Sequence, residues 1–148
     1  NKDYNLTANF NQVASSFMNQ VSVTDGDDTV DRFFGMQSGA TAGFDDNIDR
    51  DLPPPPPDGF HAHFNIPDYS LAEDYRAISE SRTVWELDFQ PDAGQTITLN
   101  WDFSNTEHMG SLTLTDDLQN PSIQIDMKSQ NSYQVSDTSV QILYIISN

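Results

Sequence analysis

The residues of this chain best suited to chemistry are oxygen-bearing side chains spaced two apart. Asp45, Asn47, Asp49 and Asp51 place a carboxylate or amide oxygen at every second position of one short segment. This spacing is that of the first half of a calcium loop, where alternate side chains converge on a cation that takes about six to eight oxygens. The segment is therefore a candidate calcium site.

The calcium pattern is incomplete beyond its first half. A helix–loop–helix calcium motif needs Gly at its sixth position and a bidentate Glu at its twelfth, whereas this chain has Arg50 and Pro56 there. That motif is excluded, and a calcium site would have to take ligands from elsewhere. A solvated acidic loop is the alternative. The further candidate ligands are the aspartates Asp25, Asp27, Asp28 and Asp58.

A pair of histidines offers a second kind of metal chemistry. His61 and His63 stand two apart in an alternating segment, so both side chains should project from one face of a strand. Such a pair could hold zinc or copper, but the sequence specifies no third ligand. Asn65 continues the same face. We therefore expect a polar row that faces solvent.

No catalytic signature occurs in the sequence. The nucleophile elbow, the H-E-x-x-H motif and the glycine-rich phosphate loops are all missing, and there is no cysteine. Neighbouring acids such as Asp116 and Asp117 could hydrolyse a glycoside only if a cleft held two carboxyl groups at the right separation. We expect a protein that is not an enzyme and has no catalytic residues.

The charge of the chain restricts its partners. Six Lys and Arg stand against 23 acids, of which 19 are Asp, and the net charge is −17. Binding to nucleic acid or to anionic lipid is therefore not expected, and cations are the natural partners. The longest apolar run, residues 142–146, is far shorter than the roughly 20 residues that cross a bilayer, so we expect no membrane span. A first residue that is Asn, with no signal-like segment after it, fits a mature secreted chain after removal of a leader, and a sequence cut at an arbitrary boundary would look the same.

Apolar alternation at period two dominates the chain. It predicts an antiparallel β-sandwich, immunoglobulin-like or jelly-roll-like, with about eight strands and little helix. Only residues 71–78 could form a helical turn or two. One strand is predicted over residues 4–10, where Tyr4, Leu6, Ala8 and Phe10 share a face. The other strands are predicted over residues 17–23, 60–66, 84–89, 96–103, 111–115, 123–127 and 140–146.

A single domain over residues 1–148 should pack around the apolar faces of these strands. Trp85 and Trp101 are in phase with apolar neighbours, so we expect core positions for both and not a sugar-stacking surface. The five prolines at 53–57 should form a stiff polyproline II segment, and we expect residues 45–58 to be an acidic and polyproline strap. A ligand for a proline-reading domain is the alternative. The other predicted core residues are Phe60, Phe64, Leu87, Phe89, Ile97, Leu99, Leu112, Leu114, Ile123, Ile125, Ile142 and Tyr144.

The last predicted strand is apolar on both faces and invites a partner. At a free sheet edge it would leave Leu143 and Ile145 exposed and its backbone unpaired. We expect Ile142, Leu143, Tyr144 and Ile145 to accept an exchangeable strand, residues 1–12, from a second copy. Repeated strand addition of this kind produces a head-to-tail filament. Pairing of residues 4–12 within their own domain is the alternative.

Ten short motifs follow one another in order along residues 34–133. They are Phe34-Gly35, the segment 40–45, Asp51-Leu52 with the prolines, Phe60 with Phe64, Asp74-Tyr75-Arg76, Trp85-Glu86-Leu87, the segments 97–102 and 112–116, Ile125-Asp126-Met127, and Tyr133. In order and spacing, about two thirds of the chain resembles a recurrent domain of large secreted bacterial surface proteins, which are often exported with a C-terminal sorting domain. Ala42 departs from the resemblance, because similar sequences usually have Asp there, and one possible calcium ligand is lost.

The resemblance implies a secreted β-sandwich unit without known catalysis. Together with the alternating termini, it leads us to expect an extracellular structural protein at the cell surface, a calcium-stabilised subunit of a filament assembled by donor-strand addition. Its main partners would be copies of itself. A monomeric secreted module that binds a glycan or a surface protein is the alternative function.

Overall fold

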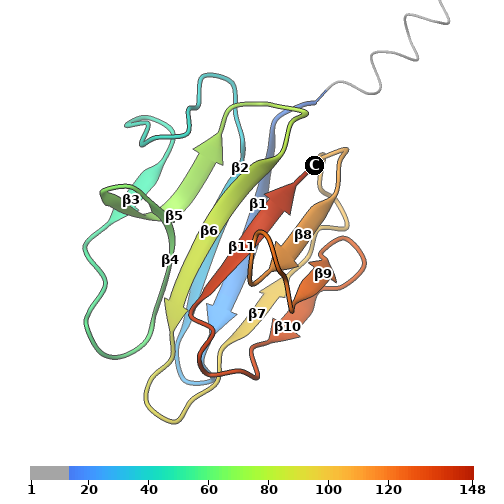
Figure 1. Cartoon of the computed structure of the whole chain (residues 1–148). Coiled ribbons are helices and arrows are strands. Elements are labelled where there is room, and N and C mark those ends of the chain that lie inside the picture. Colours follow the sequence, from blue (N-terminus) through green and yellow to red (C-terminus); the bar gives the residue numbers. More distant parts are fainter. Residues whose placement is uncertain (1–13) are drawn as a thin grey trace, which may run out of the picture.

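The computed structural model describes residues 14–148, and every element in that range is a strand. This confirms the all-β prediction. No helix in residues 14–148 could therefore span a membrane. The strands, shown in Figure 1, are β1 (Phe17–Thr24), β2 (Thr29–Met36), β3 (Arg50–Leu52), β4 (His61–Ile66), β5 (Tyr69–Arg76), β6 (Thr83–Gln90), β7 (Thr98–Trp101), β8 (Leu112–Thr115), β9 (Gln124–Asp126), β10 (Ser132–Gln134) and β11 (Ile142–Ser147).

The strands form one mixed sheet that curls strongly on itself. Its order is β10-β7-β1-β2-β5-β4-β6-β11-β8-β9, and β3 pairs with β5 outside this path. All pairs are antiparallel except β2 with β5. The curl places β1 and β2 behind β6 and β11 (Figure 1). The architecture is thus a single curled sheet of eleven strands and not a clear two-sheet sandwich of about eight.

Strand β5 joins two halves of the sheet, β10-β7-β1-β2 on one side and β4-β6-β11-β8-β9 on the other, which we call the two arms of the curl. Residues at its start pair with β4, as Leu71 does with Phe64, and residues at its end pair with β2, as Asp74 does with Phe34. The expectation of a helical turn over residues 71–78 was wrong. A local preference for helix is weak, and here the backbone ladders with β2, β3 and β4 override it.

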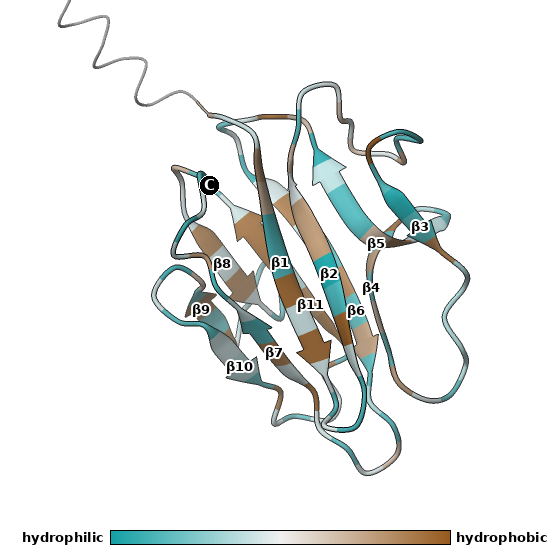
Figure 2. Cartoon of the chain, turned by 180° about the vertical axis from the view of Figure 1, so that it is seen from behind, coloured by the Kyte–Doolittle hydropathy of each residue, from teal (hydrophilic) through white to brown (hydrophobic). Residues whose placement is uncertain are grey.

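The core lies inside the curl and is built around aromatic rings. Apolar and polar bands alternate along the strands in Figure 2, as half-buried strands require. Trp85 and Trp101 are buried, as predicted. The ring of Phe34 is central: its centroid lies 5.1 Å from that of Trp85, 5.9 Å from Phe64, 5.7 Å from Phe103 and 6.2 Å from Phe17. The two arms are therefore held together by tilted and edge-to-face aromatic contacts.

Strand β11 lies inside the sheet and not at its edge. It pairs with β6 on one side and with β8 on the other. Leu143 and Ile145 are fully buried, whereas Ile142 is 36% exposed and Tyr144 is half-buried. The predicted core phase, with Ile142 and Tyr144 inward, was wrong. The two edges of β11 are covered by β6 and β8 of the same chain, and not by a strand from a second copy as expected.

The described sheet ends in short strands. β9 and β10 terminate the path and β3 branches from it, and each is three residues long. The turn between β9 and β10 is anchored by Trp101, whose Nε1 donates to the carbonyls of Met127 (2.8 Å) and Gln130 (2.7 Å). The predicted donor strand, residues 4–10, lies outside the described residues.

Prolines 53–57 lie in the connection between β3 and β4, where all five are exposed. This connection forms the wide loop beside β4 in Figure 1. Its far end is held by Asp92, whose carboxylate accepts a hydrogen bond from the Phe60 N–H at 3.0 Å. The strap therefore runs along the outside of the molecule between two anchored ends.

Candidate functional site

The carboxylates of the predicted calcium segment are engaged in the fold. Asp45 accepts hydrogen bonds from the backbone N–H of Thr41 at 2.7 Å and from its hydroxyl at 2.9 Å. Asp49 accepts from the N–H of Asp45 and from the N–H of Tyr75 in β5, both at 2.8 Å. These bonds fold the segment into a closed loop and tie it to the sheet.

The oxygens of this segment do not converge on one point. Asp49 is 8% exposed and faces inward, whereas Asn47 and Asp51 are exposed and Asp51 belongs to β3. Burial raises the pKa of Asp49, and the neighbouring carboxylates of Asp74 and Asp45 act in the same direction. The two N–H donors lower this pKa, but they do not outweigh the rise. The structure thus gives Asp49 an anchoring role in the loop.

Within residues 14–148, one group of three acidic side chains lies close enough to share a cation. Asp25 and Asp28 from the β1–β2 turn meet Asp92 from the β6–β7 connection, with one oxygen of each within 4.8 Å of the others. The sequence pointed to the first two but not to Asp92, which is 67 residues from Asp25. Asp27, the third candidate in this turn, instead accepts a hydrogen bond from the Gln95 side chain at 3.0 Å.

Asp25 already accepts hydrogen bonds from three backbone donors. Its side chain is 2% exposed, and it accepts the N–H groups of Asp27 (3.1 Å), Asp28 (2.9 Å) and Asp92 (3.0 Å). Burial by itself would raise the pKa of Asp25, but these backbone donors outweigh it and hold the pKa below its ordinary value. The Asp25 carboxylate therefore links the β1–β2 turn to the β6–β7 connection at one end of the molecule.

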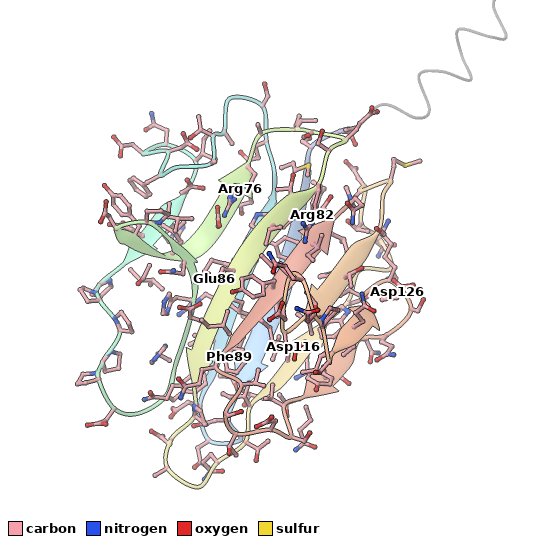
Figure 3. The ribbon with its side chains drawn as sticks, in the orientation of Figure 1. Arg76, Arg82, Glu86, Phe89, Asp116 and Asp126 are labelled. Atoms are coloured by element: carbon pink, nitrogen blue, oxygen red, sulfur yellow. The ribbon has the colours of Figure 1, made fainter. Side chains whose placement is uncertain are left out.

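A second polar cluster lies where β4 and β6 pair. His63 stands opposite Asp88, and Asn65 opposite Glu86. His63 Nε2 lies 3.9 Å from Asp88 Oδ2, and Asn65 Nδ2 donates to Glu86 Oε2 at 2.7 Å. The ring of His61 lies 5.3 Å from that of His63, tilted by 31°. Figure 3 shows Glu86 near the middle of β6. We call His61, His63, Glu86 and Asp88 the histidine–carboxylate row.

The row is more buried than its sequence suggested. His63 is 5% exposed, so the expectation of a solvent-facing polar row was wrong for this residue. Burial lowers the pKa of His63 to about 4, and the charges of His61 and Arg32 act in the same direction. Burial, with the neighbouring Glu86, raises the pKa of Asp88 to about 7. Desolvation thus favours the neutral form of both groups.

Two atoms of this row have no hydrogen-bond partner. Among the described residues, three buried side-chain atoms are without one: His61 Nδ1, Asp88 Oδ1 and Asn19 Nδ2. Buried polar atoms in folded proteins almost always find a partner, so each exception needs an explanation. Two of the three belong to the histidine–carboxylate row, which is unusual for so small a group of residues.

His108 has a buried partner that its sequence context concealed. Its Nε2 lies 2.9 Å from the hydroxyl oxygen of Ser147, and its ring lies 4.7 Å from that of Phe17. Ser147 is 1% exposed and His108 is 8% exposed, so a substrate cannot reach this serine–histidine pair. The contact joins residues 39 positions apart, and no local motif signals it.

An open groove of about 400 Å³ lies between the proline strap and the β4–β5 hairpin. Tyr69 at its side is 41% exposed, and its ring stacks on that of Phe44 with centroids 4.4 Å apart and planes 14° apart. The groove combines an aromatic side chain with polar and proline neighbours, which include Asp51, Pro54, Pro55, Asn65 and Asp68.

The chain was compared with protein-family models, with curated proteins and with solved structures, and none of them matches. The resemblance to surface-protein domains therefore stays a prediction.

Proposed function

We propose that this chain is a secreted, non-enzymatic structural protein: a β-sandwich-like subunit of a surface or extracellular filament that assembles by donor-strand addition. Residues 4–10 of one copy would add a strand to the sheet of the next. Because β11 is paired on both sides, the accepting edge would be one of the short strands that end the described sheet, and not Ile142 to Ile145.

The observation that carries this proposal is the pattern that leads into β1. Tyr4, Leu6, Ala8 and Phe10 alternate with polar residues just before Phe17, where the described sheet begins. A strand added to another sheet gains backbone hydrogen bonds together with side-chain contacts. The edges of β9 and β10 are open to receive it within the described sheet.

Charge supports a role for cations in such an assembly. Subunits with a net charge of −17 repel one another at short range, and this repulsion falls when cations screen or bridge them. Calcium is the cation that this proposal names, because 19 of the 23 acids are Asp, whose oxygens suit a hard ion. Filaments should therefore loosen when a chelator is added.

Deletion of residues 1–12 tests the proposal. The full chain should form filaments visible by electron microscopy, and the shortened chain should be monomeric by light scattering while keeping its thermal transition. Filaments formed equally well by the shortened chain would contradict strand donation. A full chain that stays monomeric, with and without calcium, would contradict it as well.

Paired variants of the donor segment provide a matched control. Leu6→Asp with Phe10→Asp places two charges on the apolar face of the predicted strand, and Thr7→Asp with Asn9→Asp places the same two charges on its polar face. The first pair should abolish assembly, because a charged side chain cannot enter an apolar pocket without a large desolvation cost. The second pair should assemble.

The groove beside Tyr69 supports a second candidate function, a monomeric module that binds a glycan. Sugar rings pack on exposed aromatic faces while their hydroxyls bond to carboxylates and amides, and this groove offers both near Asp51, Asn65 and Asp68. A glycan array probed with the chain shortened by residues 1–12 tests this function. Binding that is lost in Tyr69→Ala would support it, and an array without hits would contradict it.

A further inference from the structure

We propose that His61, His63 and Asp88 form a binding site for a transition-metal ion of the zinc or copper class. The donors come from two paired strands, with both histidines on β4 and the carboxylate on β6. The inference is independent of the proposed function, since it concerns neither the donor segment nor the acidic loops.

The donor set is one that such metals accept. Zinc and copper take imidazole nitrogens and carboxylate oxygens, and a zinc ion can be held by three protein ligands when water fills its fourth position. Calcium is a poor candidate here, because it prefers oxygen ligands alone. A set of two imidazoles and one carboxylate therefore favours zinc or copper over calcium, the cation that the acidic loops would attract.

The sheet register brings the three ligands to one place. Side chains two apart on a strand share a face, and directly paired residues on neighbouring strands are nearest neighbours on that face. His61 and His63 satisfy the first condition, and His63 with Asp88 satisfies the second. The sequence showed the histidine pair, but only the pairing of β4 with β6 supplies the third ligand.

The distances leave a modest adjustment for the metal to make. Two ligands about 2.0 Å from a tetrahedral zinc lie roughly 3.3 Å apart, and His63 Nε2 stands 3.9 Å from Asp88 Oδ2. The His61 ring is 5.3 Å from that of His63, and the three donor atoms are not all within 4.8 Å of one another. Binding therefore requires His61, the more exposed histidine, to rotate toward the other two ligands.

The unpartnered atoms are an independent observation at the same place. His61 Nδ1 and Asp88 Oδ1 are buried and have no protein partner. A bound ion with its water would satisfy such atoms, and no other polar group of the described residues does so. Glu86 would lie beside the ligands, held in place by the hydrogen bond that Asn65 Nδ2 donates to it at 2.7 Å.

The acidic group at the β1–β2 turn is the natural rival and is less suitable. Asp25 accepts three backbone N–H groups and Asp92 accepts one, so their oxygens are committed to the fold. Asp88 accepts no hydrogen bond from the backbone among those of the described residues. A metal at Asp88 would therefore not have to displace a hydrogen bond from the backbone.

Zinc titration of the full chain, followed by NMR of the histidine rings, tests the proposal without any variant. The ring resonances of His61 and His63 should shift together and stop shifting at one zinc per chain, and those of His108 should not move, because its Nε2 is engaged by Ser147. Shifts in only one of the two, equal shifts at His108, or shifts that do not saturate would overturn the proposal.

An isosteric variant adds a second readout. Asp88→Asn keeps the shape of the side chain and removes the charged ligand, so zinc affinity measured by calorimetry should fall by about tenfold or more. Asp28→Asn is the matched control, since it removes the same charge at the rival acidic group, and its affinity should equal that of wild type. Zinc affinity retained in Asp88→Asn, or lost in Asp28→Asn, would contradict the proposed site.

Discussion

Asp25 is buried and Asp88 is half-buried, both beside paired strands, and their surroundings are opposite. Asp25 accepts three backbone N–H groups, which hold its pKa below its ordinary value despite burial. Asp88 faces Glu86 and a neutral His63, and its pKa is raised to about 7. Burial alone therefore does not set the role of a carboxylate. Backbone donors make Asp25 a structural anchor, whereas Asp88 has none within the described part of the chain and would bind the metal in the proposed site.

The largest expected effect is at Asp25. Asp25→Ala leaves three N–H groups without an acceptor and should lower the free energy of unfolding by about 3 kcal/mol. Urea unfolding measures this loss. The exposed neighbour Asp28 is the control, and Asp28→Ala should change stability by less than about 0.5 kcal/mol. Equal losses in the two variants would mean that the donors around Asp25 contribute nothing.

Asp49 is an intermediate case and should show an intermediate loss. It accepts two backbone N–H groups, but burial and the carboxylates of Asp74 and Asp45 raise its pKa, so part of the gain is offset. Asp49→Ala should cost about 2 kcal/mol by urea unfolding. A loss greater than that of Asp25→Ala would break the ranking by number of donors.

Asp88 should behave in the opposite way and depend on pH. Its folded-state pKa of about 7 lies above its ordinary value of 3.8, so the folded state binds the proton more tightly and loses stability as the pH rises from about 4 to about 7. Asp88→Asn removes this loss. The free energy of unfolding of Asp88→Asn, relative to that of wild type, should therefore rise across that window. At pH 8 the variant should be more stable than wild type by about 1 kcal/mol.

This comparison is made by urea unfolding at several pH values with a chelator present. Other groups that face Asp88 titrate in both proteins and largely cancel in the difference. His63, with its pKa lowered to about 4, is one of these: its neutral form stabilises the fold above its ordinary pKa of 6.5, and this stability is lost as the pH falls toward 4. A difference that is flat from pH 4 to 8 would show that Asp88 is an ordinary acid.

Calcium should have the smallest effect on the subunit itself. Because the carboxylates of Asp25, Asp45 and Asp49 already accept hydrogen bonds, calcium would act mainly by screening and should raise the thermal midpoint of the chain shortened by residues 1–12 by about 2 °C. Sodium chloride at equal ionic strength should reproduce this shift. A calcium shift several times larger would indicate a specific site at the acidic loops.

Local patterns in the sequence predicted most of the strands. Alternating apolar residues located β1, β4, β6, β7, β8, β9 and β11 to within two residues at each end, and both tryptophans were correctly placed in the core. These predictions succeed because alternation reports which face of a strand is buried, and a strand carries that information within itself.

The failures involve partners that are distant in sequence. β5 was taken for a possible helical turn, although three other strands pair with it. Strand β11 is apolar on both faces, so its sequence does not show which face is buried. Pairing with β6 and β8 turns Leu143 and Ile145 toward the core. Strands β2, β3 and β10 were missed, because weak or short alternation does not distinguish a strand from a loop.

The candidate sites divide in the same way. The histidine pair and the acidic segments were visible in the sequence, whereas Asp92 beside Asp25, Asp88 beside His63 and Ser147 beside His108 were not. Each of these second partners lies at least 25 residues away along the chain. Spacing in a sequence can place ligands on one face of one strand, but it cannot identify the ligand on the neighbouring strand.

The sequence alone determined that this protein is an acidic, cysteine-free chain of strands, because composition and alternation are local properties that survive any arrangement of the strands. Only the tertiary structure decided which strands pair and which carboxylates meet backbone donors. The reason is physical: a carboxylate acquires its pKa, its partners and its chemistry from the groups that folding brings within a few ångströms of it, and those groups come from anywhere in the chain.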